Sequence, residues 1–120
     1  MANELEITTT YSAKGIVVGR CWNFQLAGYN TVNFTGFNSE EELTEFVLSN
    51  LKENKGIDAG MGFERMLVVA LNIKETHKTM IGNREFTHEF IHNPVILSVD
   101  DITENDYIDA MDIIDTWFLS

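Results

Sequence analysis

Three segments in the first third of the chain alternate apolar and polar residues with a period of two, which is the pattern of strands that bury one face. Their bounds are residues 4–11, 16–26 and 31–37. Lys14 and Gly15 predict a turn between the first two, and Gly28 with Asn30 predicts a turn between the last two, because glycine and asparagine tolerate turn conformations. We therefore expect three consecutive strands here.

A helix is predicted to begin after Ser39. The spacing of Ser39 and Glu42 is that of a capping box, in which each side chain satisfies a free backbone N–H of the first turn. Apolar residues then recur every three or four positions, as they do in a helix with one buried face. The predicted inner face consists of Leu43, Phe46, Val47, Asn50 and Leu51. Gly56 stands where a left-handed cap would end the helix, and the glycine-rich segment 56–62 predicts a loop.

The middle of the chain predicts a hairpin. A long strand is expected over residues 63–79, since it contains a continuous apolar run that suits a central strand. Gly82 and Asn83 then form a two-residue turn of the type that requires positive backbone φ angles. Residues 84–92 are expected to return as the second strand, and residues 95–99 form a further short strand.

The last element is predicted to be a helix that begins at Thr103, which makes a second capping pair with Asp106. Apolar residues follow at steps of three and four. They are Tyr107, Ala110, Met111, Ile114, Trp117 and Phe118. The predicted element order is βββαββ(β)α, in one α+β domain spanning residues 1–120. Its antiparallel sheet would carry both helices packed on one face.

Composition places the chain among ordinary globular proteins, because 44% of its residues are hydrophobic and 22% are charged. The single cysteine, Cys21, cannot form an internal disulfide, which favours a reducing compartment. The N-terminus lacks the basic and apolar regions of a signal peptide, and the longest apolar run, residues 66–71, is far too short to span a membrane. We expect a cytosolic protein with no cofactor.

Charge is the strongest functional signal. The formal net charge is −11, which disfavours direct binding to nucleic acid or to an anionic membrane, because both require cations to neutralise phosphates. No lysine or arginine follows Arg84, whereas nine carboxylates do. They are Glu85, Glu89, Asp100, Asp101, Glu104, Asp106, Asp109, Asp112 and Asp115. Such a one-sided distribution favours a basic protein surface as the partner.

Several acids of the last helix lack a local reason to be there. Asp109, Asp112 and Asp115 oppose the helix dipole, and aspartate is a mediocre helix former. With Asp106 they place carboxylates about 5 Å apart along the helix, which is similar to the phosphate spacing of nucleic acid. We therefore expect a non-enzymatic binding protein, with nucleic-acid mimicry as one form of it; a solvated face that only aids solubility is the alternative. The predicted binding residues are Glu40, Glu41, Glu45, Asp106, Asp109, Asp112 and Asp115.

A competing hypothesis is enzymatic. Residues 88–92 read HEFIH, which resembles the HExxH motif of the zincin metallopeptidases. The resemblance implies a helix on which His88 and His92 bind zinc and Glu89 acts as general base. A third ligand would come from Glu104, Asp109 or Asp112. Pro94 follows closely and disfavours a continuing helix.

The hairpin interpretation of the same segment makes a different prediction. It pairs His77 with His88 across the two strands, on one face together with His92. His88 and His92 would then be about 13 Å apart, too far to share one metal ion. We favour this interpretation, which still leaves room for a weak metal site or a pH-sensitive histidine cluster.

A third hypothesis is a pocket for a small planar or nucleotide-like ligand. Five aromatic residues lie close together in the sequence and suit base stacking. They are Trp22, Phe24, Tyr29, Phe34 and Phe37. Arg20 and Arg84 are the cations that we expect to meet an anionic group of such a ligand. Core packing is the simpler explanation of these aromatics.

Overall fold

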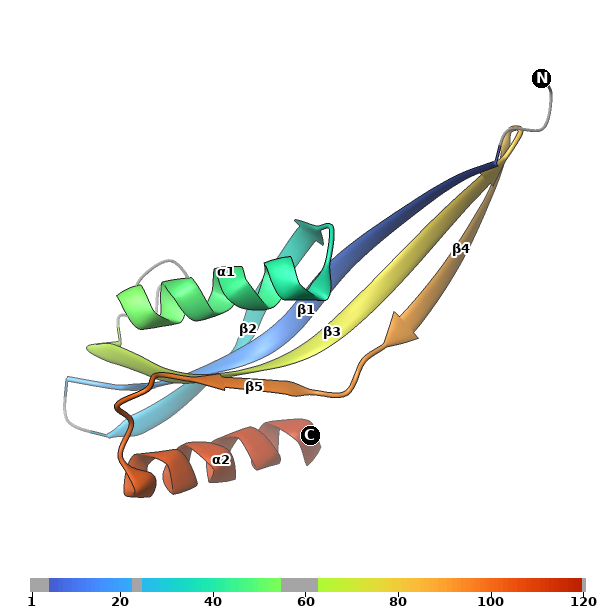
Figure 1. Ribbon diagram of the computed structural model, residues 1–120. Coiled ribbons are helices and arrows are strands. Elements are labelled where there is room, and N and C mark those ends of the chain that lie inside the picture. The colour runs from blue at the N-terminus through green and yellow to red at the C-terminus, as the bar shows by residue number, and fades with distance from the viewer. Residues whose placement is uncertain (1–4, 23–24, 55–62, 120) are drawn as a thin grey trace.

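Figure 1 shows a computed structural model of the protein, which describes residues 5–22, 25–54 and 63–119. In this part of the chain the fold is α+β, as predicted, with a five-stranded antiparallel sheet and two helices. The element order is ββαβββα. The bounds are β1 (Leu5–Arg20), β2 (Leu26–Phe37), α1 (Glu40–Glu53), β3 (Arg65–Ile81), β4 (Arg84–Ile91), β5 (Val95–Ser98) and α2 (Glu104–Leu119).

Two long strands, β1 and β3, form the centre of the sheet, whose order is β2-β1-β3-β4. Strands β4 and β5 both pair with β3, one after the other along its length: β4 pairs with residues 74–81 and β5 with residues 68–71. Both helices pack against the same half of this sheet, and we call this half, with its helices, the body (Figure 1). The other half, which we call the arm, consists of residues 5–12, 74–81 and 84–91. The molecule is therefore elongated: its extents are 63 × 28 × 23 Å.

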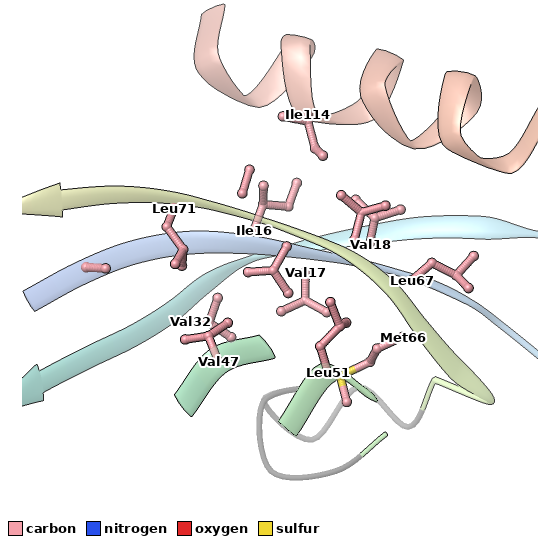
Figure 2. Packing of buried hydrophobic residues seen from close by; sticks show 14 of the residues in the cluster. Ile16, Val17, Val18, Val32, Val47, Leu51, Met66, Leu67, Leu71 and Ile114 are labelled. Atoms are coloured by element: carbon pink, nitrogen blue, oxygen red, sulfur yellow. The ribbon is translucent and has the colours of Figure 1, made fainter. Parts of the chain in front are cut away.

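The helices cover opposite faces of the sheet, so the prediction that both pack on one face was wrong (Figures 1 and 2). Val47 and Leu51 of α1 lie on one side, and Ile114 of α2 lies on the other. The physical reason lies in the central strands, because residues 66–71 of β3 are all buried. A strand without polar alternation is buried on both faces and requires cover on both.

The two turns predicted in the first third of the chain were also wrong. Lys14 and Gly15 lie inside β1, and Gly28 lies inside β2; the strands instead reverse between Arg20 and Leu26. These glycines make room for neighbours. A Cβ atom on Gly15 would lie 2.6 Å from the carbonyl oxygen of Ala70, and one on Gly28 would lie 2.8 Å from the Ile113 side chain.

The predicted helix starts are confirmed. The Ser39 hydroxyl accepts a hydrogen bond from the Glu42 N–H at 3.0 Å, and the Thr103 hydroxyl accepts one from the Asp106 N–H at 3.2 Å. The predicted end of α1 is wrong, since Asn54 takes the left-handed conformation with φ of 58°. Its side chain donates to the Glu64 carbonyl just before β3 and accepts from the Met66 N–H at 2.7 Å, which fixes the helix end to the sheet. Gly56 and the predicted loop lie outside the described residues.

The predicted hairpin is confirmed in position and register. Ile81 pairs with Arg84, Thr79 with Phe86, and His77 with His88. The turn glycine, Gly82, has φ of +62°, the region that favours glycine. In the part of the chain that the structure describes, no helix is long and apolar enough to cross a membrane.

Candidate functional site

The pentapeptide that resembles HExxH lies on strand β4 and not on a helix. His88 and Glu89 therefore point to opposite faces of the sheet, and His92 follows the end of the strand. A zincin site needs both histidines on one face of a helix, so the helical arrangement that the resemblance implies is wrong. Among the described residues, no group of three or more His, Cys, Asp or Glu side chains is placed to hold a metal ion.

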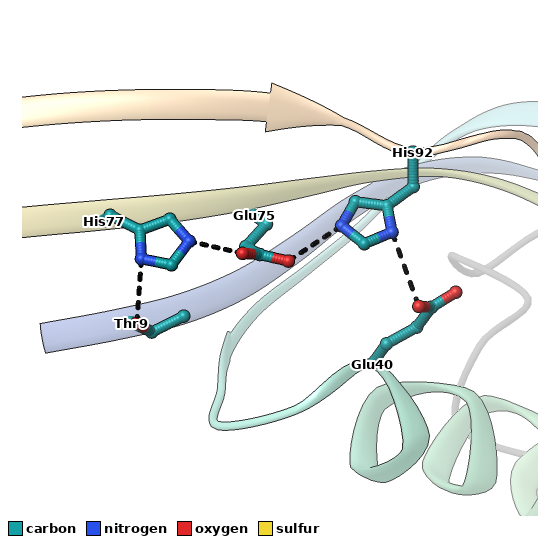
Figure 3. Close-up of polar contacts among 5 residues, drawn as sticks. All are labelled: Thr9, Glu40, Glu75, His77 and His92. Carbon is teal, nitrogen blue, oxygen red and sulfur yellow. Dashed lines mark hydrogen bonds and ion pairs between the residues drawn. The ribbon is translucent and has the colours of Figure 1, made fainter.

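Two of the three histidines instead belong to a polar chain at the base of the arm (Figure 3). His77 bonds Glu75 through Nε2, and its Nδ1 lies 3.0 Å from Thr9 Oγ1. The other Glu75 oxygen lies 3.0 Å from His92 Nε2, and His92 Nδ1 lies 3.4 Å from a carboxylate oxygen of Glu40. The chain thus joins β1, β3, the residue after β4 and the first turn of α1.

The Glu75 carboxylate is the centre of this chain. Hydrogen bonds from His77, and then from Tyr11 and His92, hold its pKa below the ordinary value of 4.5, although desolvation acts in the opposite direction. The bond to Glu75 raises the pKa of the Tyr11 phenol above 10.0. The carboxylates, the imidazoles and the phenol thus satisfy one another's hydrogen-bonding groups. We call this set of residues the clamp, because its contacts connect the arm to the body.

We expect the clamp to give the protein a specific acid sensitivity. Because the folded-state pKa of Glu75 is lowered, its stabilising contribution is present above pH 4.5 and is lost as the pH falls below that value. The Glu75→Gln variant should therefore lose less stability than the wild type between neutral and acidic pH. Urea denaturation at a series of pH values measures this difference. Glu85→Gln, on the outer strand of the arm, is the control, and equal pH slopes for Glu75→Gln and the wild type would contradict the expectation.

The acidic C-terminal region divides into paired and unpaired carboxylates. Within the described residues, four of the nine form ion pairs with cations from earlier in the chain. These pairs are Lys74–Glu89, Lys52–Asp100, Arg65–Asp101 and Arg20–Asp106. Asp106, a predicted binding residue, is thus occupied in holding α2 to the end of β1. The hydrogen bond from the Arg65 guanidinium lowers the pKa of the Asp101 carboxyl below its ordinary value.

The remaining acids of α2 make no ion pair within the described part of the chain. They are Glu104, Asp109, Asp112 and Asp115, and all four are exposed. Asp109 and Asp112 line a shallow hollow of about 490 Å³ together with Arg20 and Asp106. Of the four predicted carboxylates of this helix, Asp109, Asp112 and Asp115 are therefore exposed, and Asp106 is held by Arg20.

The outer face of α2 also exposes large apolar side chains, which the charge pattern alone did not indicate. Ile108 is 51% exposed and Leu119 is 89% exposed. At 100° per residue, both lie on one stripe with Glu104, Asp112 and Asp115, and the centre of this stripe is about 140° around the helix from the midpoint of the buried Ala110 and Ile114. We call these five residues the α2 outer stripe; they are Glu104, Ile108, Asp112, Asp115 and Leu119.

The acids of α1 lie elsewhere. Glu41 and Glu45 are exposed, but α1 covers the opposite face of the sheet from α2 (Figure 1). Glu40 is engaged with His92 in the clamp. The seven predicted binding residues therefore do not form one surface, and a partner that contacts a flat face of the protein meets one helix or the other.

The aromatic residues predicted for a ligand pocket serve mainly the core. Phe34 and Phe37 pack against Phe46 of α1 at centroid distances of 6.2 and 5.4 Å. Trp22 is 74% exposed, and Phe24 lies outside the described residues. The two predicted cations are far apart, because Arg20 ends β1 in the body and Arg84 lies at the tip of the arm.

A different hollow, which the sequence did not indicate, lies beside the C-terminal end of α2. Its volume is about 440 Å³, and Lys14, Lys74 and Trp117 line it with Asn33 and Asn72. Strand pairing brings the polar residues together, since Lys14 pairs with Asn33 on one side and with Asn72 on the other. Two ammonium groups, two amides and an indole ring would suit a planar ligand with an anionic group.

No protein-family model matches the chain, and searches of curated proteins and of solved structures find no significant match.

Proposed function

We propose that the protein acts by binding and that α2 presents its outer stripe to a basic protein surface. The observation that carries the proposal is the composition of this stripe, in which carboxylates alternate with exposed Ile108 and Leu119. Exposed carboxylates steer and orient a cationic partner. Aliphatic groups supply apolar area that becomes buried on contact.

The exposed aliphatic residues distinguish this proposal from the simpler one of solubility. A helix face that serves only solubility gains nothing from Ile108 and Leu119, because exposed aliphatic groups promote association. The helix also contains no cation to neutralise its acids, and its last turn lacks the lysine or arginine that would favour the dipole. Both features lower the stability of the isolated protein, and a basic partner would remove both disadvantages.

Mimicry of nucleic acid is the more specific form of the proposal. Asp109, Asp112 and Asp115 follow one another at three-residue steps, which is about 4.5 Å along the helix axis. This spacing is comparable to the separation of phosphates along a strand, so the helix would compete for the groove of a nucleic-acid-binding protein. Because the helix and nucleic acid would compete for the same groove, the partner would release its nucleic acid when it binds this protein.

Charge reversal on α2 tests the proposal. The immobilised chain is exposed to the fraction of a cell extract that binds DNA-cellulose, and retained proteins are eluted with salt and then measured individually. We expect Asp109→Lys/Asp112→Lys/Asp115→Lys to weaken binding by at least about a hundredfold, because two carboxylates of the outer stripe and the adjacent Asp109 become cations that repel a basic partner. Wild-type binding should also weaken steeply with salt.

The matched control reverses acids on the opposite face, in Glu41→Lys/Glu45→Lys. Binding should survive this change, and circular dichroism should show that both variants are folded. Retention of the partner by the α2 variant, or loss of the partner only in the α1 variant, would reject the proposal. Duplex DNA added as a competitor then tests mimicry, since a mimic and DNA cannot occupy the same groove.

A further inference from the structure

The arm has two chemically different faces. Strand pairing aligns its three strands so that Leu5 lies beside Ile81, Ile7 beside Thr79, and Thr79 beside Phe86. We call the face that these residues share the apolar arm face. It consists of Leu5, Ile7, Thr9, Tyr11, Glu75, His77, Thr79, Ile81, Arg84, Phe86, His88 and Phe90. The opposite, polar arm face carries Glu6, Lys74, Lys78, Glu85 and Glu89 among threonines, with Met80 and Ile91 as its apolar residues.

This alternation is the pattern of a sheet with one buried face, yet the apolar arm face is open. Leu5 and Ile7 are each 59% exposed, Phe90 is 55%, Ile81 is 47% and Phe86 is 44%. Together they exceed the scattered apolar side chains of an ordinary protein surface and mark an interaction site.

The same sheet face is covered in the body. By the same register, Ala13, Val17 and Leu71 continue the apolar arm face, and all three are buried on the side where α1 packs. Helix α1 begins at Glu40, at the base of the arm, and runs away from it (Figure 1). The apolar arm face is thus the part of a continuous hydrophobic surface that no described element of this chain covers.

The distribution of charge indicates what can approach the arm. The arm has four carboxylates and three cations, a net charge of −1, whereas the whole chain has −11. These residues are Glu6, Glu75, Glu85 and Glu89, with Lys74, Lys78 and Arg84. A second copy of this acidic protein would be repelled by the body, but the arm presents almost no net charge to it. A strongly basic partner has little to bind there.

The apolar arm face is also complementary to itself. Its cation, Arg84, lies at the tip, and its carboxylate, Glu75, lies at the base near Glu40. If two arms pack face to face in opposite directions, the tip of each meets the base of the other. Arg84 of one copy then lies near the acidic base of its partner, and the two acidic bodies lie at opposite ends.

We propose that two copies of the chain associate through their apolar arm faces, antiparallel about a two-fold axis. Three strands of about eight residues give a footprint of roughly 27 by 14 Å per copy. The two footprints together amount to about 750 Å², which the relief of the side chains increases towards the lower limit of the roughly 1,200–2,000 Å² of stable interfaces. The expected dimer is therefore concentration-dependent, with a dissociation constant in the micromolar range.

Sedimentation equilibrium of the full chain tests this association from about 1 to 300 µM, where a micromolar dimer must change its population. We expect the average mass to rise from the monomer value of 13.7 kDa towards twice that value. Phe86→Glu should weaken association by at least about tenfold, since it places a carboxylate in the contact. Ile91→Glu is the matched control, because Ile91 is 72% exposed on the opposite face of the same strand.

The outcomes are separable. A monomer throughout the range, or a dimer that Phe86→Glu leaves unchanged, overturns the proposal, as does equal weakening by Ile91→Glu. Should Phe86→Glu fail to fold by circular dichroism, Ile7→Glu makes the same test from β1. The direction of packing is tested in a Cys21→Ser background with a short bismaleimide cross-linker: Thr79→Cys near the middle of the arm should cross-link, and Arg84→Cys at the tip should not. Cross-linking at the tip alone would contradict the antiparallel arrangement.

Discussion

Replacement of Ile114 by alanine is expected to lower the free energy of unfolding by about 3–4 kcal/mol, which is typical of a large aliphatic residue removed from a core. Ile114 is fully buried and projects from α2 towards Ile16 and Val18 of β1 (Figure 2). It is the only large side chain of the described part of α2 that is fully buried, since the other buried residue is Ala110 and the remaining apolar contacts come from partly buried residues. Urea denaturation measures the change.

The matched control is Ile108→Ala on the same helix. Ile108 belongs to the α2 outer stripe, so the same loss of atoms should change stability by no more than about 0.5 kcal/mol. Comparable losses for the two variants would mean that α2 does not pack as described. The contrast also matters for function, because the proposed binding role requires that the outer stripe contributes little to folding and is available to a partner.

The features predicted correctly from sequence are those set by neighbouring residues. The caps at Ser39 and Thr103 depend on a hydroxyl and a backbone N–H three positions later. The register of the hairpin follows from Gly82 and Asn83 alone, because a two-residue turn fixes every pair beyond it. That register was enough to place the HExxH-like segment on a strand and to separate His88 from His92.

The features predicted incorrectly depend on residues that are distant in sequence. Gly15 and Gly28 indicated turns, whereas their lack of a side chain accommodates Ala70 and Ile113. A glycine can serve either a turn or a close contact, and only the residue that packs against it in the fold decides which. The position of the helices, in contrast, had a signal: the uninterrupted apolar run 66–71 requires cover on both faces, which two helices on one face cannot supply.

The candidate site was predictable in part for the same reason. The exposed acids of α2 follow from its helical periodicity, and the structure leaves most of them open. The neutralisation of Asp106 was not predictable, since its partner Arg20 lies 86 residues away in sequence. The hollow beside Trp117 combines residues of four strands and one helix, so no local pattern brings Lys14 and Lys74 together.

The two proposed surfaces are compatible in one molecule. The apolar arm face lies on the side of the sheet that α1 covers, whereas α2 lies on the other side (Figure 1). Association through the arms would therefore leave both outer stripes free. A dimer would carry two acidic helices far apart, and a partner with two basic sites would bind it with greater avidity than a monomer.

A substitution at Gly15 is expected to have the second large effect on stability. The Cβ atom of Gly15→Ala would lie 2.6 Å from the backbone oxygen of Ala70 and 2.8 Å from Leu71 Cδ2. A backbone atom in the adjacent central strand cannot move aside as the end of a side chain can. β1 and β3 must separate locally, and we expect a loss of about 2–4 kcal/mol, since such overpacking is costly.

Gly82→Ala is the appropriate comparison, because a Cβ atom there would meet nothing within 4 Å. Its backbone has a positive φ of 62°, so alanine should cost only about 1 kcal/mol of conformational strain. Urea denaturation at low protein concentration compares the two variants without a contribution from association. If Gly15→Ala is no more destabilising than Gly82→Ala, the close contact between β1 and β3 is not maintained in solution. The larger loss at Gly15 would show that this glycine is required by the packing of two strands and not by a turn.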